Sequence, residues 1–295
     1  MKRKIINVLF ALLFLVGFGI LAYPTISNQW NTYRQSKLIS NYQTMTEAYE
    51  EEDFTREWEK AKRYNDKITV NAPKTDGVFG EETDGQEDTE YEKVLNINGD
   101  GMMGYLTIPK INVDLAIYHG TSDTVLQTGI GHIEGTGLPI GGENNHSVLA
   151  AHRGLPSAKL FTDIDQLEAG DEFYIHILDQ TLAYKVDQIL PMVDKDDHEA
   201  LDRAMQIEKG KDYVTLFTCT PYGVNTHRLL VRGVRTEYHE EDIQHAPQDN
   251  IRRLLEDYYM FFLIAGLGVT IIGIGVVKLW LNRKRGRKEK VKKAK

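Results

Sequence analysis

The only cysteine of the chain, Cys219, lies at the end of an apolar run and nine residues before Arg228. The run, residues 213–219, is rich in β-branched and aromatic residues and therefore predicts a strand. Pro221 and Gly223 supply turn residues before a second apolar run begins beside Arg228. A thiol and a guanidinium are thus expected at the same end of a hairpin, where a thiolate can act as a nucleophile and an arginine can stabilise developing negative charge.

The thiol has three interpretations, because a single cysteine has no partner for an intramolecular disulfide. It is a reactive nucleophile, it forms an intermolecular bridge, or it is an inert buried side chain, since free cysteine is among the most buried residue types. The first interpretation requires a nearby imidazole that generates or stabilises the thiolate.

His152 has the most suitable context among the nine histidines. It ends the apolar run of residues 146–152 and precedes a turn, as Cys219 does. A strand end places a polar side chain at the mouth of a barrel rather than inside it. Taken alone, His152 has the same pattern as an ordinary edge histidine. The weaker candidates are His119, His132 and His227.

Both ends of the chain are basic, and both flank long apolar runs. Residues 5–23, with Asn7 as the polar exception, follow the basic residues 1–4, and residues 258–281 precede a tail, 282–295, with nine Lys or Arg and one Glu. Each run is long enough to cross a bilayer core of about 30 Å. The positive-inside rule places both termini in the cytoplasm and the middle of the chain outside. A cleaved signal peptide is the alternative for the first run, but the lack of a clean A-x-A site favours an uncleaved anchor.

The formal net charge is −8, and the middle of the chain is more acidic still, because basic residues are concentrated at the two ends. Such a balance argues against nucleic acid as a partner. The chain contains no GxGxxG or GxxxxGK[ST] phosphate loop and no CxxC, HExxH or GxSxG motif. One cysteine also excludes a thiolate zinc cluster, so neither a metal nor an organic cofactor is implied.

The chain between the apolar runs changes character along its length. Residues 24–67 have apolar residues at helical spacing, which predicts amphipathic helices. Residues 68–95 form an acidic stretch that is a linker or, because it contains Val78 and Phe79, a lid. The predicted segments are a cytoplasmic N-terminus (1–4), an anchor (5–23), a helical region (24–67), an acidic loop (68–95), a barrel (96–240), a linker (241–257), a transmembrane helix (258–281) and a basic cytoplasmic tail (282–295).

The predicted barrel consists of short apolar runs separated by Gly, Pro, Asn and Asp. Regular short strands with little helical pattern are typical of a β-barrel or a sandwich. Short helices are expected at residues 122–126 and 199–207. The predicted strands are residues 103–111, 113–120, 146–152, 172–178, 182–190, 213–219 and 228–234.

Several motifs resemble one known family. The pentapeptide TLFTC, residues 215–219, matches the TLxTC signature of sortases. The blocks GHIEGTGLPIGG, HSVLAAHRGLPSAKLF and CTPYGVNTHRLLVRG are similar to the pilus-assembling branch, class C. The resemblance extends from about residue 96 to residue 233, and the arrangement of two anchors and an N-terminal helical region also resembles that branch.

This resemblance implies a closed eight-stranded β-barrel and a set of catalytic roles. Cys219 matches the nucleophile, His152 the catalytic imidazole and Arg228 the arginine that stabilises substrate and oxyanion. The family cleaves an LPxTG-like sorting signal between Thr and Gly, holds the acyl group as a thioester and passes it to an amine. In the pilus branch, that amine is a pilin lysine. The implied partners are therefore pilins or surface proteins with a sorting signal, and the lipid bilayer.

The acidic loop departs from the class C pattern. That class usually has a lid with an Asp-Pro-aromatic motif over the active site, whereas this chain reads NAPKTDGVFG. Asp76 and Phe79 are the nearest equivalents, with Gly77 and Val78 between them instead of one proline. Asp76 and Phe79 are therefore the expected lid contacts of a lid that is looser or differently anchored.

The sequence predicts a membrane-anchored cysteine transpeptidase on the outer face of a Gram-positive cell that assembles pili. A housekeeping-type sortase that attaches proteins to peptidoglycan is the alternative within the same chemistry, and the lid-length insertion and the C-terminal span argue against it. A non-catalytic membrane-tethered scaffold would keep its function after Cys219→Ala. A papain-like hydrolase would have its cysteine before its histidine, the reverse of the order here.

Overall fold

The computed structural model describes residues 2–68, 90–239, 266, 268 and 275. Residues 27–247 form one compact unit, and residues 1–26 belong to a second one. The chain begins with two helices, α1 (Lys2–Glu47) and α2 (Glu51–Lys67). The predicted helical region therefore consists of helix, although the boundary expected after residue 23 is not a helix end, since Pro24 lies inside α1.

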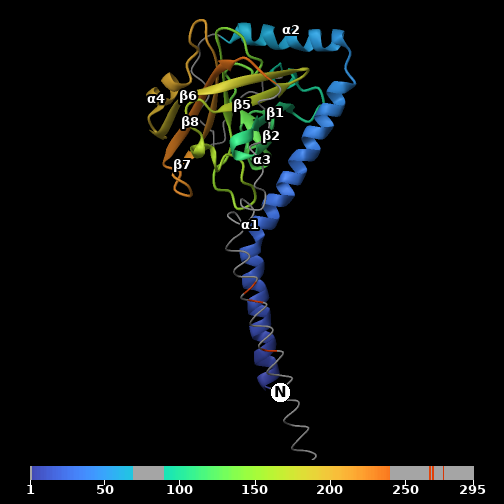
Figure 1. The fold of residues 1–295 in the computed structure, drawn as a ribbon, viewed down its shortest axis with the longest axis vertical. Helices are drawn as coiled ribbons and strands as arrows, with labels where there is room; N and C mark the ends of the chain where they lie inside the picture. The colour runs from blue at the N-terminus through green and yellow to red at the C-terminus, as the bar shows by residue number, and fades with distance from the viewer. Residues whose placement is uncertain (1, 69–89, 240–265, 267, 269–274, 276–295) are drawn as a thin grey trace, which may run out of the picture. The chain divides into compact units, whose positions relative to one another are not determined.

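The strands of the described chain form a closed barrel (Figure 1), in the order β1-β2-β3-β4-β7-β8-β6-β5. Most neighbouring strands are antiparallel, but β2 pairs with β3, and β4 with β7, in parallel. The strands are β1 (Met102–Ile108), β2 (Val113–His119), β3 (Ile130–His132), β4 (Asn145–Ala150), β5 (Glu172–Ile177), β6 (Gln180–Asp194), β7 (Asp212–Thr220) and β8 (His227–Thr236). The predicted closed eight-stranded barrel is confirmed.

Each apolar run that predicted a strand overlaps one strand of the barrel. The remaining strand, β3, has only three residues, too few for an alternating pattern in the sequence. The two predicted short helices correspond to α3 (Asp123–Thr128) and α4 (His198–Ala204), where Ser122 caps α3 by accepting a hydrogen bond from Val125 N.

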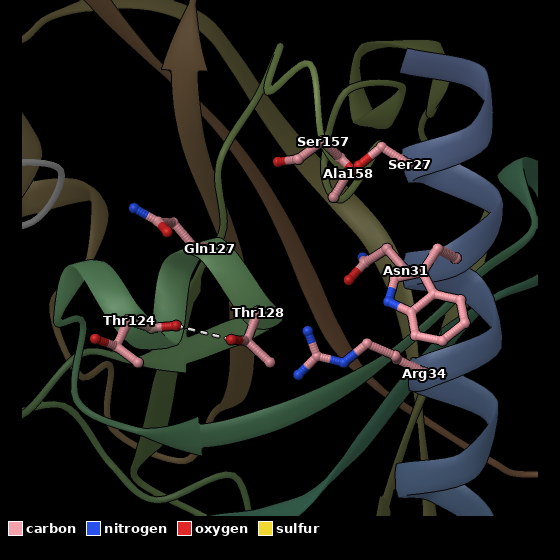
Figure 2. Close-up of a pocket in the computed structure, with 9 residues that line it drawn as sticks. Ser27, Asn31, Arg34, Thr124, Gln127, Thr128, Ser157 and Ala158 are labelled. Atoms are coloured by element: carbon pink, nitrogen blue, oxygen red, sulfur yellow. Dashed lines mark hydrogen bonds between the residues drawn. The ribbon is translucent and has the colours of Figure 1, made fainter. Parts of the chain in front are cut away.

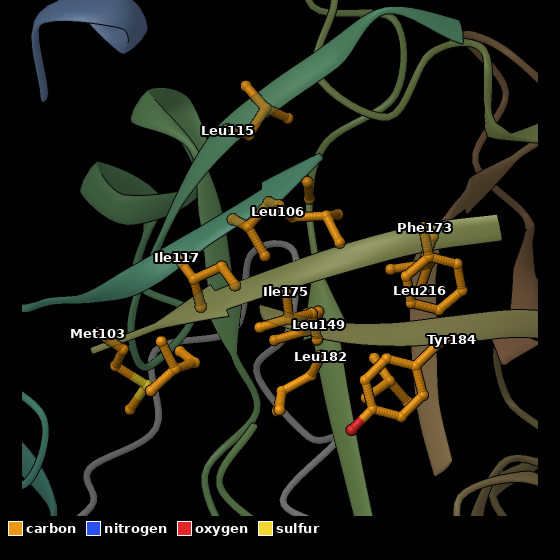
Figure 3. Close-up of a cluster of buried hydrophobic side chains, with 14 of the residues drawn as sticks. Met103, Leu106, Leu115, Ile117, Leu149, Phe173, Ile175, Leu182, Tyr184 and Leu216 are labelled. Carbon is orange, nitrogen blue, oxygen red and sulfur yellow. The ribbon is translucent and has the colours of Figure 1, made fainter. Parts of the chain in front are cut away.

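The barrel wall separates two hydrophobic clusters because successive residues of a strand face opposite sides. One cluster draws buried side chains from strands around the whole barrel and fills its interior (Figure 3). The other includes residues of α4 and lies on the outer face of β4, β7 and β8. Inner members are Leu149, Leu216 and Val231; outer members are Ala150, Phe217 and Leu230.

Both N-terminal helices bind to the barrel through buried aromatic residues. Tyr42 of α1 is 1% exposed; its hydroxyl donates to Met103 O at 2.9 Å and accepts from Leu178 N at 2.8 Å. Trp58 of α2 donates from Nε1 to Asp179 Oδ1 at 2.7 Å. These contacts use one face of each helix, as the spacing of apolar residues predicts.

Among the described residues, α1 is the one helix that is long and apolar enough to cross a membrane, judged by length and composition. Apolar side chains on it, including Leu13, Val16 and Ile20, are more than half exposed. The second predicted span (258–281), the linker (241–257) and the basic tail (282–295) lie outside the described residues, apart from three isolated positions in the span.

The expected lid contacts, Asp76 and Phe79, also lie outside the described residues. The chain on either side of this interval is described, and Lys67 Nζ lies 2.6 Å from Glu90 Oε1. The described chain therefore leaves α2 and resumes at neighbouring positions.

Replacing Tyr42 with phenylalanine should lower the free energy of unfolding of the barrel, because Tyr42 attaches α1 to it. The change leaves Leu178 N–H and Met103 O without their buried partner, which costs about 1–3 kcal/mol. Thermal unfolding followed by near-UV circular dichroism should show a Tm lower by several degrees, at about 2–4 °C per kcal/mol for a domain of this size. Tyr33→Phe, on the exposed part of α1, is the control, and an equal Tm in the two variants would contradict the role of the Tyr42 hydroxyl.

Candidate active site

Two of the three residues predicted to do chemistry lie on adjacent strands, and the third, His152, follows the end of β4. Cys219 of β7 and Arg228 of β8 are direct partners in the antiparallel pairing. In the parallel pairing of β4 with β7, Ala150 is the partner of Phe217, and Ala151 N donates to Phe217 O at 3.2 Å. Continuing this register by two residues places His152 beside Cys219.

The strand pleat determines where these side chains point. Ala150, Phe217 and Leu230 are register partners on β4, β7 and β8, and all belong to the outer cluster. Cys219 and Arg228 each lie two residues from one of them within their strands, so these two side chains face the same outer side of the barrel. His152 lies two residues after Ala150, beyond the end of β4. Neighbouring strands lie about 4.8 Å apart. We call these three residues the polar row; it continues the outer cluster toward the ends of the strands.

Cys219 is a free cysteine and is 5% exposed. Burial raises the pKa of its thiol, because a thiolate loses hydration there, and the positive charge of Arg228 acts in the opposite direction. The net direction is upward, so the thiol is protonated near neutral pH. Arg228 is the charged group whose effect on the thiol favours the nucleophilic form.

His152 is half-buried in the loop after β4. Burial lowers the pKa of its imidazole, and the carboxylate of Asp123 at the start of α3 opposes this decrease. The pKa of the Cys219 thiol is raised and the pKa of the His152 imidazole is lowered. The uncharged forms of both groups therefore predominate. Asp123 is a contributor that the sequence did not reveal, because no motif joins it to the histidine block.

The Arg228 guanidinium is held at the turn between β7 and β8. Its Nη1 donates to Asn225 O at 3.2 Å and to His227 O at 3.3 Å. These backbone acceptors direct the guanidinium along the end of β8. His227 itself is occupied at the turn, with Nδ1 2.9 Å from Thr226 Oγ1.

His119 and His132 serve the fold rather than the polar row. The two ring nitrogens of His119 lie 2.9 Å from Gly101 O and 2.8 Å from Val94 O. His132 Nδ1 lies 2.9 Å from the hydroxyl of Tyr91, and burial lowers the pKa of His132 to about 4. Both rings therefore fasten the chain that precedes β1 to the barrel.

Thr218 lies on the opposite side of β7 from Cys219. It is fully buried, and its Oγ1 donates to Ala151 O at 2.7 Å. This bond joins the end of β4 to β7 one residue before His152 and Cys219. Thr218 therefore holds the end of β4 against β7.

A cavity of about 280 Å³ lies between α1 and α3 (Figure 2). Ser27 Oγ donates to Ser157 O at 3.0 Å, and Asn28 Oδ1 accepts from Lys159 N at 2.9 Å, so α1 holds the loop that follows His152. The lining residues are Ser27, Trp30, Asn31, Arg34, Thr124, Gln127, Thr128, Ser157 and Ala158. None of them belongs to the polar row. In the part of the chain that the structure describes, no group of three or more His, Cys, Asp or Glu is placed to hold a metal ion.

Comparisons with known proteins agree with the fold of the barrel. The sortase domain family matches residues 106–236. Sortase C1 of Streptococcus agalactiae is 48% identical, with a TM-score of 0.61 over 69% of this chain and 100% of that one. A sortase C of Streptococcus pneumoniae is 39% identical, with a TM-score of 0.60 over 68% of this chain and 97% of that one.

The similarity also extends to a sortase outside these streptococcal proteins. Sortase SrtE2 of Streptomyces coelicolor is 34% identical over 147 residues, 46% of this chain, and the match spans 57% of that relative's length. The identity to the S. agalactiae structure over its full length is sufficient to establish the family. The chain belongs to the sortase family of cysteine transpeptidases, and the solved structures that it resembles are class C sortases.

Proposed function

We propose that this chain is a membrane-anchored class C sortase that joins pilins. It cleaves an LPxTG-like sorting signal between Thr and Gly, holds the acyl group on Cys219 and transfers it to a lysine amine of the next pilin. The observation that supports the proposal is the direct pairing of Cys219 with Arg228 across β7 and β8. The parallel register of β4 with β7 supports His152 as the third member, because it lies two residues after Ala150. The S. pneumoniae sortase C is described together with pilin substrate specificity, which supports this acceptor.

The first half of the reaction forms the thioester. The Cys219 thiolate attacks the threonine carbonyl carbon, and the guanidinium of Arg228 stabilises the oxyanion that results. As the C–N bond to glycine breaks, the imidazolium of His152 gives its proton to the leaving amine. Cys219 then carries the acyl group, and His152 is neutral.

The second half reverses these roles. Neutral His152 takes a proton from the incoming lysine amine while the nitrogen attacks the thioester carbonyl. The C–S bond breaks, the sulfur leaves as a thiolate, and an isopeptide bond remains. The imidazolium and thiolate are thereby restored for the next cycle.

The reactive pair is a minor species. With ordinary pKa values, the thiolate and imidazolium lie about 2.7 kcal/mol above the neutral pair. The opposite pKa shifts of Cys219 and His152 increase this difference. Arg228 and Asp123 each reduce it, because one stabilises the thiolate and the other the imidazolium.

The membrane location rests on the apolar part of α1, which supports an N-terminal anchor. The proposal retains the second span at 258–281, the extracellular barrel and two cytoplasmic termini, which follow from the distribution of Lys and Arg. It also retains Asp76 and Phe79 as lid contacts.

Incubating the full chain in detergent with an LPxTG-type peptide should produce a covalent adduct on Cys219, detected by intact mass. Cys219→Ala should abolish the adduct because it removes the sulfur. A pilin-derived peptide with a lysine amine and an amine derived from peptidoglycan should then be offered in competition. Lysine-linked product supports pilus assembly; exclusive transfer to the peptidoglycan amine would favour the housekeeping function, and a folded chain without adduct would favour the scaffold.

Arg228→Lys should reduce the rate of thioester formation by about 10²–10³, the cost of losing one oxyanion donor. Lysine keeps the positive charge but not the planar fork. The pH at which iodoacetamide alkylates Cys219 at half-maximal rate should therefore stay near the wild-type value in Arg228→Lys and rise in Arg228→Ala. An unchanged midpoint in both variants would show that Arg228 does not act on the thiol.

The rate of peptide cleavage should have a broad bell-shaped dependence on pH. The acid limb follows His152, whose pKa lies below its usual value of 6.5, and the alkaline limb follows Cys219, whose pKa is raised above 9.0. Asp123→Asn removes the charge that raises the imidazole pKa, so the acid limb should move to lower pH and the maximal rate should fall. An acid limb that moves upward would contradict this assignment.

A further inference from the structure

The residue after His152 is an arginine whose side chain is only 10% exposed. Arg153 Nη1 donates to Thr220 Oγ1 at 3.2 Å, and Nη2 donates to Asp165 Oδ2. Thr220 directly follows Cys219, and Asp165 lies in a short 3-10 helix (Ile164–Gln166). One guanidinium thus connects the loop of the catalytic histidine with the strand of the nucleophile.

This connection uses the face of β7 opposite to Cys219. Because successive side chains of a strand alternate, Thr220 faces away from Cys219, and Arg153 bonds to Thr220 from the loop after β4. Thr218 Oγ1 bonds to Ala151 O on that same side. The two side-chain bonds therefore bracket the pair of His152 and Cys219, one residue before it and one residue after it.

The second of these bonds lies where the backbone pairing has ended. β4 ends at Ala150, and the bond from Ala151 N to Phe217 O is the last one that continues its register. Beyond it, Gly154, at φ +82°, lies against the ring of Tyr222: a Cβ there would come 3.0 Å from Tyr222 Cε2. Side-chain contacts with residues 220–222 thus hold the loop after β4 where strand pairing no longer does.

The burial of Arg153 is costly for a residue that only stabilises the fold. Removing a guanidinium from water costs several kcal/mol, which an ion pair offsets only with good geometry and satisfied donors. The carboxylate partner Asp165 is 46% exposed, and among the described residues the buried Nε of Arg153 has no hydrogen-bond partner. The side chain nevertheless meets two segments at defined positions, which suits a forked donor and not a single ammonium.

We propose that Arg153 is a positioning residue for the transpeptidation, a role that rests on the function proposed above. Its guanidinium fixes the loop of His152 to Thr220, the residue that follows Cys219. It thereby sets the distance between the imidazole of His152 and the sulfur of Cys219. Arg153 acts through His152 and does not contact the substrate.

The test compares thioester formation in full-length Arg153→Met, Arg153→Lys and Arg232→Met. Arg232 is the matched control, because its side chain is 17% exposed and paired with Asp187 and Glu208, but it lies outside the polar row. Arg153→Met should lower kcat by about 10-fold to 100-fold, the scale expected when a catalytic group is misplaced by about 1 Å, with KM little changed. Arg153→Lys should recover only part of the loss, and Arg232→Met should lower Tm without this loss of kcat.

Alkylation of Cys219 by iodoacetamide separates positioning from unfolding. A displaced histidine loop slows peptide cleavage and leaves the alkylation midpoint near the wild-type value, since burial and Arg228 dominate the thiol pKa. A site that merely opens would expose the thiol and speed its alkylation. Faster alkylation in Arg153→Met would therefore overturn the positioning role.

A double-mutant cycle with Thr220→Val tests the bond itself, and the single variant Thr220→Val tests it even if Arg153→Met folds poorly. Valine keeps the shape of Thr220 but removes the acceptor, so Thr220→Val should lower kcat in the same direction, and the double variant should be no slower than Arg153→Met. Additive losses would overturn the inference. A wild-type chain that forms no adduct refutes the proposed function, whereas a wild-type chain that forms it no faster than Arg153→Met refutes only the role of Arg153.

Discussion

The site depends on the parallel pairing of β4 with β7. His152 and Cys219 are far apart in the sequence, and the register in which Ala150 faces Phe217 brings together the two segments that carry them. A slip of one residue would turn the side chains of β4 to the other face of the sheet and shift the loop that carries His152. Parallel strands require a long crossover, and residues 151–211 provide it with β5, β6 and α4. The segment between β4 and β7 thus makes the parallel register of these two strands possible.

The surroundings of Cys219 keep its thiol protonated, and therefore weakly nucleophilic, in the chain without substrate. Cys219 is buried beside the outer cluster, and burial favours the thiol over the thiolate. A protonated thiol is a poor target for oxidants and electrophiles. Arg228 acts in the opposite direction, because its positive charge favours the thiolate. In the proposed reaction, the same side chain would also stabilise the oxyanion.

Features that depend on neighbouring residues in the chain could be predicted from the sequence. Contacts between segments that are distant in the sequence could not. The strands with alternating or continuous apolar runs could be predicted from residue types, and the juxtaposition of Cys219 and Arg228 from the turn residues between them. The three-residue strand β3 gives no such pattern. The effect of Asp123 on His152, and the bridge from Arg153 to Thr220, depend on how distant segments pack. No spacing in the chain indicates either contact.

The ion pair between Lys67 and Glu90 has a consequence for how this scaffold can diverge. Chain that leaves and rejoins a domain at one point adds closure entropy that grows only slowly with its length. Because the two ends of the interval 69–89 meet at one place, its length can change at a small entropic cost to the barrel. The length of this interval and the register of the strands can therefore diverge independently among related chains, while the proposed lid contacts would constrain its sequence.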